Sequence, residues 1–261
     1  MKKIGFMIVY NDVDYLDHTL TSFKDFVDEM IIVEGAFEIT TKGGNPSRSD
    51  DGTLDILSKH VDNKKIFLKH VNLREHKDHY DIGYQWALER NADWAIMVDS
   101  DEIWTEQMKN IVDVTLKKQS TKTLDIKEIR LHEYCFINDF KTWYPGVYPR
   151  IFKAEKDAFF VFDNEVQFKN GRGQHNYLVL GDSFKNFHYG YVRNNKRWKL
   201  KQDCMWEKDF NPINLQYKLD GDKYIIPSDI PIYNFTGQHP DIMKNHKFYN
   251  MSASDIIYGV K

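Results

Sequence analysis

The chain of 261 residues has few of the features that mark several large classes of protein. It contains only two cysteines, Cys135 and Cys204, which lie far apart and form no CxxC pair. This excludes a disulfide framework and a thiolate zinc site, and it is typical of a reducing compartment. The net charge of -3 gives no electrostatic footprint for nucleic acid, so no nucleic-acid partner is expected.

Long hydrophobic runs are missing as well. No stretch approaches the ~20 apolar residues that a membrane-spanning helix needs. The apolar run at 4–9 is soon followed by Asn11 and Asp12, which makes it too short for a signal peptide. We therefore expect a cytoplasmic protein without a membrane span.

The first hundred residues alternate between apolar runs and amphipathic segments. The runs at 4–9, 30–33, 66–71 and 94–98 have the continuous hydrophobicity of strands that are covered on both faces. Between them, apolar residues recur at helical spacing, as at Leu16, Leu20 and Phe23. This alternation predicts an α/β fold with a mainly parallel sheet, in which ligands bind beyond the carboxyl ends of the strands.

After residue 101 the alternation changes. A helix is expected at 106–118, strand-like segments at 128–137, 147–152 and 159–168, and a basic helix at about 196–210. The last fifty residues hold four of the seven prolines, which predicts an irregular tail wrapped on the body. No linker is visible, so we expect a single domain over 1–261.

The clearest chemical motif follows the apolar run at 94–98 and reads Asp99-Ser100-Asp101-Glu102. Residues two apart in an extended chain point to the same side, so Asp99 and Asp101 face one spot. Hard carboxylate oxygens suit Mg²⁺ or Mn²⁺, which keep positions open for water and phosphate oxygens. The alternative is an acidic turn that caps the following helix.

Four motifs together resemble the glycosyltransferase family 2 superfamily, which has the GT-A fold. They are Tyr10-Asn11-Asp12, Val33-Glu34-Gly35-Ala36, Asp51-Gly52-Thr53-Leu54 and Asp99-Ser100-Asp101-Glu102. The resemblance covers residues 1–110 well and the remainder loosely. It implies a GT-A-type α/β fold, with a mainly parallel nucleotide-binding sheet flanked by helices, a mixed acceptor-side region and an irregular C-terminal tail.

The resemblance also implies roles for particular residues. The DxD-type carboxylates of the family bind the metal that grips the donor diphosphate, which maps onto Asp99 and Asp101. The nucleoside and the rest of the donor are then expected at Tyr10, Asn11, Glu34, Asp51 and Ser100. Many relatives carry a basic residue where Ile82 or Gly83 stands here, and we expect Lys77 or Arg74 to substitute.

Three later segments extend the resemblance. Phe187-His188-Tyr189-Gly190-Tyr191 resembles the segment that supplies a metal-binding histidine, His188 here; the alternative is a histidine held in an aromatic cluster. Segment 148–152, followed by Asp163-Asn164-Glu165, is similar to a strand and an acidic motif near the acceptor. Glu165 is therefore the first candidate for the catalytic base and Asp163 the second. Similar residues occur in related sequences at the positions of Gly237, His239 and Pro240, and we assign them no role.

The resemblance implies a hexosyltransferase that uses Mn²⁺ or Mg²⁺ and a nucleotide-sugar donor, UDP-sugar by default. It also implies that the acceptor is a glycan or another hydroxyl-bearing molecule and that the reaction inverts the anomeric centre. Residues 1–110 would form the donor half, 111–210 the acceptor half and 211–261 the C-terminal wrap. A nucleotidyltransferase is the first alternative, but 10–14 lack its glycine-rich phosphate loop. A non-catalytic glycan-binding module is the second.

Overall fold

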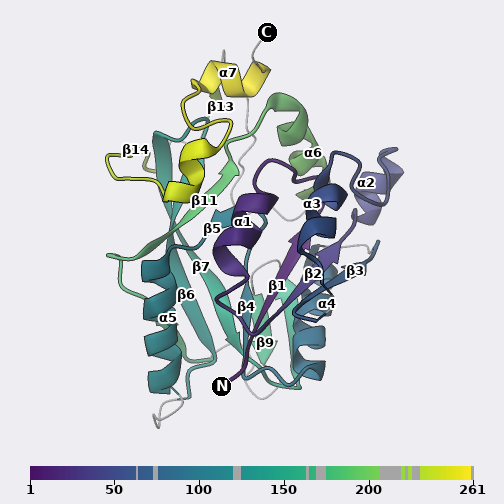
Figure 1. The fold of residues 1–261 in the computed structure, drawn as a ribbon, viewed down its shortest axis with the longest axis vertical. Coiled ribbons are helices and arrows are strands. Elements are labelled where there is room, and N and C mark those ends of the chain that lie inside the picture. Colours follow the sequence, from purple (N-terminus) through teal and green to yellow (C-terminus); the bar gives the residue numbers. More distant parts are fainter. Residues whose placement is uncertain are drawn as a thin grey trace.

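The computed structural model describes residues 1–62, 64–72, 76–119, 125–162, 165–168, 175–205, 219–220, 223–224 and 230–259. A ten-stranded sheet runs through the molecule, in the order β3-β2-β1-β4-β7-β6-β11-β5, with β10 beside β6 and β14 beside β7 (Figure 1). The mixed α/β architecture predicted from the sequence is confirmed.

The parallel part of the sheet is built by the first hundred residues. The strands are β1 (Lys3–Val9), β2 (Glu29–Glu34), β3 (Ile66–His70) and β4 (Trp94–Met97), and all three of their pairings are parallel. The helices between them are α1 (Leu16–Phe23), α2 (Glu38–Lys42), α3 (Thr53–His60) and α4 (His76–Glu89). All but the first residue of β1 are buried, as expected of a strand with helices on both faces.

The second part of the sheet is mixed. It contains β5 (Glu102–Ile103), β6 (Glu128–Ile137), β7 (Thr142–Lys153), β10 (Tyr177–Val179) and β11 (Lys185–Tyr191), with α5 (Glu106–Gln119) after β5. Strand β7 pairs antiparallel with β4 and with β6, whereas β11 is parallel to β6 and antiparallel to β5. Strands β8 (Ala158–Phe162) and β9 (Glu165–Phe168) form a separate antiparallel hairpin.

Apolar side chains cover both faces of the parallel strands. On one face, Met7 and Val9 of β1 pack with Leu20 of α1 and Val112 of α5. On the other face, Ile4, Phe6 and Ile8 pack with α4 and with the β8–β9 hairpin. Helix α4 approaches β1 closely at Gly83, where an added Cβ would lie 2.9 Å from the Phe6 ring. The layers therefore hold the carboxyl ends of β1, β2 and β4 in fixed positions.

The remaining elements lie toward the C-terminus. They are α6 (Asn195–Met205), β12 (Leu219–Asp220), β13 (Lys223–Tyr224), β14 (Tyr233–Asn234), the 3₁₀ helix η1 (Asp241–Asn245) and α7 (Ala253–Tyr258). Met243 and Phe248 join an aromatic core with Tyr15, Phe136 and Tyr189, so residues 230–259 pack onto the sheet. No helix in the described ranges is both long and apolar enough to span a membrane.

Element boundaries agree with the sequence in most places. Helix α6 begins at Asn195, and the expected end of the basic helix near Phe210 lies outside the described residues. The expected strand at 147–152 is longer, because β7 starts at Thr142. Strand β11 was not expected as a strand, since its segment was read only as a histidine motif.

Candidate functional site

A cavity of about 190 Å³ lies at the carboxyl ends of β1, β2 and β4. This is the edge where an open parallel sheet binds its ligands. Loops after the three strands contribute Tyr10, Gly35 and Asp99, and the far wall comes from β7, β11 and α6. The polar and aromatic residues that line it are Tyr10, Asn11, Asp12, Phe37, His79, Tyr80, Asp99, Ser100, Asp101, Tyr148, Arg150, His188, Tyr191, Arg193 and Arg197.

The loop after β1 is joined to segment 49–51 by hydrogen bonds. Asn11 adopts a left-handed backbone conformation with φ 49°, and its side chain accepts a hydrogen bond from the Asp50 N–H at 2.9 Å. The Ser49 hydroxyl oxygen accepts one from the Asn11 N–H at 2.9 Å. The Tyr10 hydroxyl donates to the Pro46 carbonyl at 2.8 Å. Tyr10 and Asn11, both predicted at the donor site, therefore lie on a fixed cavity wall.

Glu34 supports that wall from behind. Its carboxylate is fully buried, and one oxygen accepts a hydrogen bond from the Ser49 N–H at 2.7 Å. The other oxygen lies 2.6 Å from His70 Nδ1. The next residue, Gly35, has φ 145°, and a Cβ there would lie 1.8 Å from the Val71 carbonyl oxygen, so only glycine fits. Glu34 thus anchors segment 47–51 instead of lining the cavity.

Asp51 is also held by neighbouring groups. It accepts hydrogen bonds from the Thr53 N–H at 2.9 Å and the Val13 N–H at 3.2 Å, and it pairs with Arg197. Burial raises its pKa, but the bonds from Thr53 and the charge of Arg197 hold the pKa below its usual value. Asp51 therefore fixes Arg197 beside the Asn11 carbonyl, to which Arg197 also donates.

Among the residues that the structure describes, no lysine or arginine of α4 lines the cavity. Lys77 lies in the first turn of α4 and is half-buried, but it is not among the described residues that line the cavity. Arg74 lies outside the described residues. Positive charge comes instead from Arg150 on β7 and from Arg193 and Arg197 around the start of α6.

Asp99 is oriented by two side chains. The Tyr80 hydroxyl donates to Oδ1 at 2.8 Å, and Arg150 Nη2 donates to Oδ2 at 3.0 Å. Burial raises the pKa of Asp99, but Arg150 and His188 outweigh it and keep the pKa below its usual value. Asp99 is therefore an anion whose direction is set by Tyr80 and Arg150.

Asp101 lies between two cationic side chains. His188 Nε2 is 3.1 Å from Oδ1, and Arg193 Nη2 is 2.5 Å from Oδ2. Arg193 also binds Asp12 at 2.6 Å, and Asp12 accepts a hydrogen bond from the Ser100 hydroxyl. Although burial lowers the pKa of His188, Asp101 together with Cys135 and Glu133 raises it well above its usual value.

The arrangement fits a divalent cation. One carboxylate oxygen each from Asp99 and Asp101 and a ring nitrogen of His188 all lie within 4.8 Å of one another. The 3.1 Å between His188 Nε2 and Asp101 Oδ1 matches the spacing of about 3 Å between neighbouring ligands of an octahedral ion with ~2.1 Å bonds. The structure thus brings together the three residues that the sequence nominated as metal ligands.

Charge balance points the same way. The connected network around the cavity contains the guanidinium groups of Arg150 and Arg193. Against them stand the carboxylates of Asp12, Asp99, Asp101, Glu102 and Glu133. Burial, with Glu133 and Asp99 close by, raises the pKa of Glu102 well above its usual value despite Arg150. Even with Glu102 neutral and His188 protonated, four carboxylates stand against three cationic groups at low solvent exposure, and a divalent cation in place of the His188 proton would offset the remaining negative charge.

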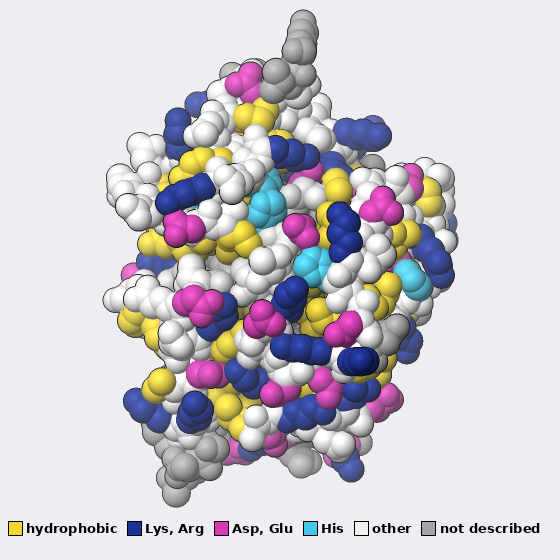
Figure 2. Space-filling model, viewed as in Figure 1, with side chains coloured by type: hydrophobic (Ala, Val, Ile, Leu, Met, Phe, Trp, Pro, Cys, Tyr) yellow, Lys and Arg dark blue, Asp and Glu magenta, His cyan; other side chains and the backbone are white. Residues whose placement is uncertain are grey.

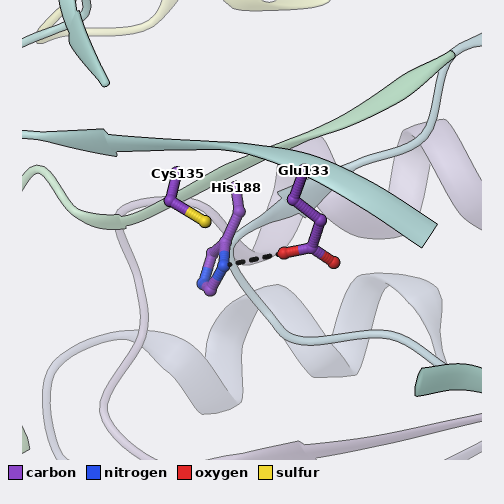
Figure 3. A group of neighbouring side chains, drawn as sticks. All are labelled: Glu133, Cys135 and His188. Carbon is purple, nitrogen blue, oxygen red and sulfur yellow. Dashed lines mark hydrogen bonds and ion pairs between the residues drawn. The ribbon is translucent and has the colours of Figure 1, made fainter. Parts of the chain in front are cut away.

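His188 also belongs to a second group of possible metal ligands, together with Glu133 and Cys135. Figure 3 shows Glu133 and Cys135 of β6 next to His188 of β11, and their ligand atoms also lie within 4.8 Å of one another. All three side chains are buried. Burial raises the pKa of the Cys135 thiol. Glu133 and Cys135 are not among the described residues that line the cavity, so His188 lies between them and the cavity. Arg150 Nε lies 3.0 Å from the Glu133 carboxylate.

The expected catalytic base lies on the β8–β9 hairpin. Glu165 begins β9 and pairs with Phe162 across the hairpin, but its side chain is outside the described part of the structure, as is Asp163 altogether. The hairpin is near the site, since Phe160 stacks on Tyr80 at 5.5 Å between ring centroids. Tyr80 is the residue that holds Asp99.

His239, which had no assigned role, is a packing residue. Its Nδ1 lies 2.8 Å from the Tyr189 hydroxyl and its Nε2 lies 2.7 Å from the Phe140 carbonyl oxygen. A neutral ring satisfies both partners, with Nε2–H as the donor to the carbonyl. Burial lowers the pKa of His239, which favours that neutral form. His239 therefore joins residues 237–240 to β11.

Charged side chains of both signs are mixed over the face seen in Figure 2. No large field of one sign covers this face, in line with the balanced composition of the chain. The concentration of charge is instead inside the cavity.

No family model and no curated protein matches the chain. Solved structures do match in fold. TarS of S. aureus, a GT-A glycosyltransferase, is 12% identical in its fragment 1–349, with a TM-score of 0.44 over 72% of this chain and 60% of that one. A longer TarS structure is 13% identical, with a TM-score of 0.46 over 77% of this chain and 38% of that one. The chain thus spans less than two thirds of either TarS structure.

A third match is 4-diphosphocytidyl-2C-methyl-D-erythritol synthase from Anaerococcus prevotii. It is 14% identical, with a TM-score of 0.34 over 59% of this chain and 70% of that one. The structural neighbours thus include a glycosyltransferase and a nucleotidyltransferase.

Several residues of the site were not nominated from the sequence. Tyr80, Arg150, Arg193 and Arg197 line the cavity and bind its acidic residues. The basic character of α6 was visible in the sequence, but nothing there indicated that Arg193 would meet Asp12, 181 residues earlier.

Proposed function

We propose that this chain is a divalent-metal-dependent glycosyltransferase, which moves a hexose from a nucleoside-diphosphate sugar to an acceptor hydroxyl. The observation that carries the proposal is the convergence of Asp99, Asp101 and His188 in a cavity at the carboxyl ends of parallel strands. UDP-sugar is the default donor. Residues 1–110 would bind the donor, 111–210 the acceptor, and 211–261 would complete the single domain.

The nucleoside would lie against Tyr10 and Asn11. Phe37 and His79, whose ring centroids are 4.6 Å apart, supply a further aromatic wall of the same cavity. Asp51 and Glu34 would act from behind, by holding Arg197 and segment 47–51 in place. In this proposal Tyr10 and Asn11 would contact the ligand, and Glu34 and Asp51 would support them.

The diphosphate would lie between the metal ligands and α6. Arg193 and Arg197 both line the cavity and are held in place by carboxylates. Guanidinium groups bind phosphate oxygens well because their donors are planar and bidentate. They would supply the positive charge that the resemblance expects from a basic residue near α4.

Asp99, Asp101 and His188 would hold the metal ion, with Ser100 keeping Asp12 in position behind them. When bound, Mg²⁺ or Mn²⁺ neutralises the charge that develops on the leaving diphosphate. Tyr80 and Arg150 would orient Asp99 toward that site. His188 must present Nε2 without a proton to act as a ligand.

An acceptor hydroxyl must lose a proton as it attacks the anomeric carbon. The acceptor oxygen would attack the anomeric carbon on the face opposite the leaving diphosphate, which inverts that centre, and Glu165, with Asp163 as second candidate, would accept the proton. The contact between Phe160 and Tyr80 supports a position of the hairpin near the cavity.

The test is hydrolysis and transfer with a panel of nucleotide sugars, with and without Mn²⁺. We expect release of nucleoside diphosphate that stops in EDTA and returns with Mn²⁺ or Mg²⁺. Release of pyrophosphate from a nucleoside triphosphate would indicate a nucleotidyltransferase instead. Binding of a glycan without any turnover would indicate a binding module.

A thermal-shift screen identifies the donor independently of the acceptor. A nucleotide sugar present at 100 times its Kd should add about 2.7 kcal/mol of stability. The shift should require Mn²⁺ if the ion bridges protein and diphosphate. A shift of equal size in EDTA would contradict the metal dependence.

A further inference from the structure

The imidazole of His188 has a partner on each side. Nε2 faces Asp101 at 3.1 Å, and Nδ1 faces Glu133 at 3.2 Å. Glu133 is fully buried and points toward the ring from β6, as Figure 3 shows. One nitrogen therefore faces the cavity while the other faces a fixed internal carboxylate.

We infer that Glu133 is the positioning residue of the metal site: it accepts the Nδ1–H of His188 and so leaves the Nε2 lone pair directed at Asp99 and Asp101. The inference rests on the metal-binding function proposed above. A hydrogen bond at one ring nitrogen decides which tautomer is present, and therefore which nitrogen is free to bind a cation. Without that bond, either nitrogen could carry the proton.

Glu133 is itself well fixed. Arg150 Nε binds Glu133 at 3.0 Å, and Arg150 Nη2 binds Asp99 at 3.0 Å. Arg150 is only 1% exposed, so this guanidinium cannot reorient freely. A single buried arginine thus sets the direction of Asp99 and, through Glu133, the direction of His188.

The sheet register places Glu133 and His188 side by side. Strands β6 and β11 are parallel neighbours, and His188 pairs with Cys135, two residues beyond Glu133 on the same strand. Alternation along β6 puts Glu133 and Cys135 on the same face. The contact between Glu133 and His188 is therefore a consequence of the register and does not depend on a loop.

The chain provides a matched control on the same strand. Glu128 is also buried, and it binds Arg130 Nε at 2.6 Å and His175 Nε2 at 2.9 Å. It therefore repeats the pattern of a buried carboxylate between an arginine and a histidine. His175, however, belongs to neither group of metal-ligating side chains found among the described residues.

The experiment compares Glu133→Gln with Glu128→Gln and the wild-type protein. Binding of Mn²⁺ alone is measured by the electron paramagnetic resonance signal of the free ion, and folding is measured by melting temperature in EDTA. We expect Glu133→Gln to bind Mn²⁺ about 10- to 100-fold more weakly than wild type. Glu128→Gln should be destabilised to a similar extent as Glu133→Gln but should bind Mn²⁺ with wild-type affinity.

The outcomes separate this inference from the proposed function. If wild-type protein binds no Mn²⁺, the metal-dependent function fails and the inference fails with it. If wild type binds Mn²⁺ and Glu133→Gln binds it equally well, only the positioning role of Glu133 is overturned. Equal weakening in Glu128→Gln would show a general effect of stability and would also overturn it.

A second measurement needs no variant at position 133 and applies even if Glu133→Gln fails to fold. Long-range ¹H–¹⁵N spectra of histidine-labelled wild-type protein report which nitrogen of each ring carries a proton. The signal of His188 is the one that is missing from the spectrum of His188→Asn. With saturating Mg²⁺, His188 should be protonated at Nδ1 and not at Nε2. A proton on Nε2, or an ion bound through Nδ1 to the Glu133 and Cys135 side, would overturn the inference.

Discussion

At the scale of single residues, Asp101 has the most demanding position in the site. Its side chain is 4% exposed and binds both His188 and Arg193. Truncation to alanine would leave two buried cationic groups without their partner, which typically costs about 3–5 kcal/mol. A loss of activity in Asp101→Ala would therefore mix loss of the metal with loss of stability.

Asp101→Asn separates the two effects better, because the amide keeps the volume and can still accept a hydrogen bond from Arg193. We expect donor hydrolysis to fall by at least ~100-fold, since a neutral amide oxygen binds a hard divalent ion more weakly than the carboxylate it replaces. The melting temperature in EDTA should change much less than in Asp101→Ala. Asp113→Asn on α5, which only removes a pair with Lys3, is the control. Full turnover of Asp101→Asn at saturating Mn²⁺ would exclude Asp101 as a ligand.

Glu165 is tested by separating donor binding from transfer. Loss of a general base typically costs ~100- to 10,000-fold in rate, whereas donor binding depends on the metal side of the cavity. Glu165→Gln should therefore bind the nucleotide sugar normally in calorimetry and transfer it poorly. Asp163→Asn is the matched comparison. Normal transfer by Glu165→Gln together with an inactive Asp163→Asn would move the role to Asp163.

At the scale of elements, α6 and the segment before it bring positive charge to the cavity. Arg193 lies just before α6 and Arg197 lies in its first turn, and both reach the loop at the end of β1. We expect Arg197→Ala to weaken binding of UDP about 10-fold or more, since charge-assisted hydrogen bonds contribute ~1.5–3 kcal/mol each. Lys199→Ala, an exposed position on the same helix, should bind UDP as wild type does. Equal affinities of all three proteins would place the diphosphate elsewhere.

The elements themselves could largely be predicted from the sequence. Parallel strands β1, β2 and β4 are covered on both faces, so their residues form uninterrupted apolar runs. The DxD-type motif could be placed for the same reason, because it directly follows such a run. Strand β11 was missed because Phe187, His188 and Tyr189 alternate between two buried faces, so no polar alternation marks them.

The partners of the site residues could not be predicted in the same way. Arg150 contacts Asp99, 51 residues away, and Arg193 contacts Asp101, 92 residues away. Such contacts depend on the strand order β4-β7-β6-β11, which local hydrophobic patterns do not encode. The sequence therefore nominated the groups that could hold a metal ion, but not the arginines that orient and neutralise them.

At the scale of the whole molecule, the buried His246 and the half-buried His239 fasten the C-terminal segment to the rest. His246 Nε2–H donates to the Asp14 carbonyl at 2.9 Å, and Nδ1 accepts a hydrogen bond from the Phe248 N–H at 3.1 Å. The ring stacks on Tyr15 with 4.5 Å between centroids. The bond from Phe248 requires a neutral ring, because a protonated Nδ1 cannot accept it. The fold around the cavity, where Asp14 also binds Arg197, thus depends on an uncharged His246.

This dependence predicts a loss of stability in mild acid. Burial lowers the pKa of His246 to about 4, against an ordinary value near 6.5, although the Asp14 carbonyl opposes the shift. The unfolded chain therefore binds more protons than the folded chain between about pH 6.5 and pH 4, so stability must fall as the pH is lowered through that window. The cost at pH 4 reaches about 3 kcal/mol for this group.

The measurement is urea unfolding from pH 7 to pH 4.5 for wild type and for His246→Gln. We expect the variant to be less stable than wild type at pH 7, because the stacking on Tyr15 is lost. Glutamine can form similar hydrogen bonds but does not titrate, so the variant should lose less stability on acidification. The difference between the two proteins isolates His246, because all other titrating groups are shared. Adding His239→Gln should flatten the pH dependence further, since burial also lowers the pKa of His239. Parallel pH profiles of wild type and His246→Gln would show that His246 titrates alike in the folded and unfolded chains, and that neutral His246 is not what holds residues 230–259 in place.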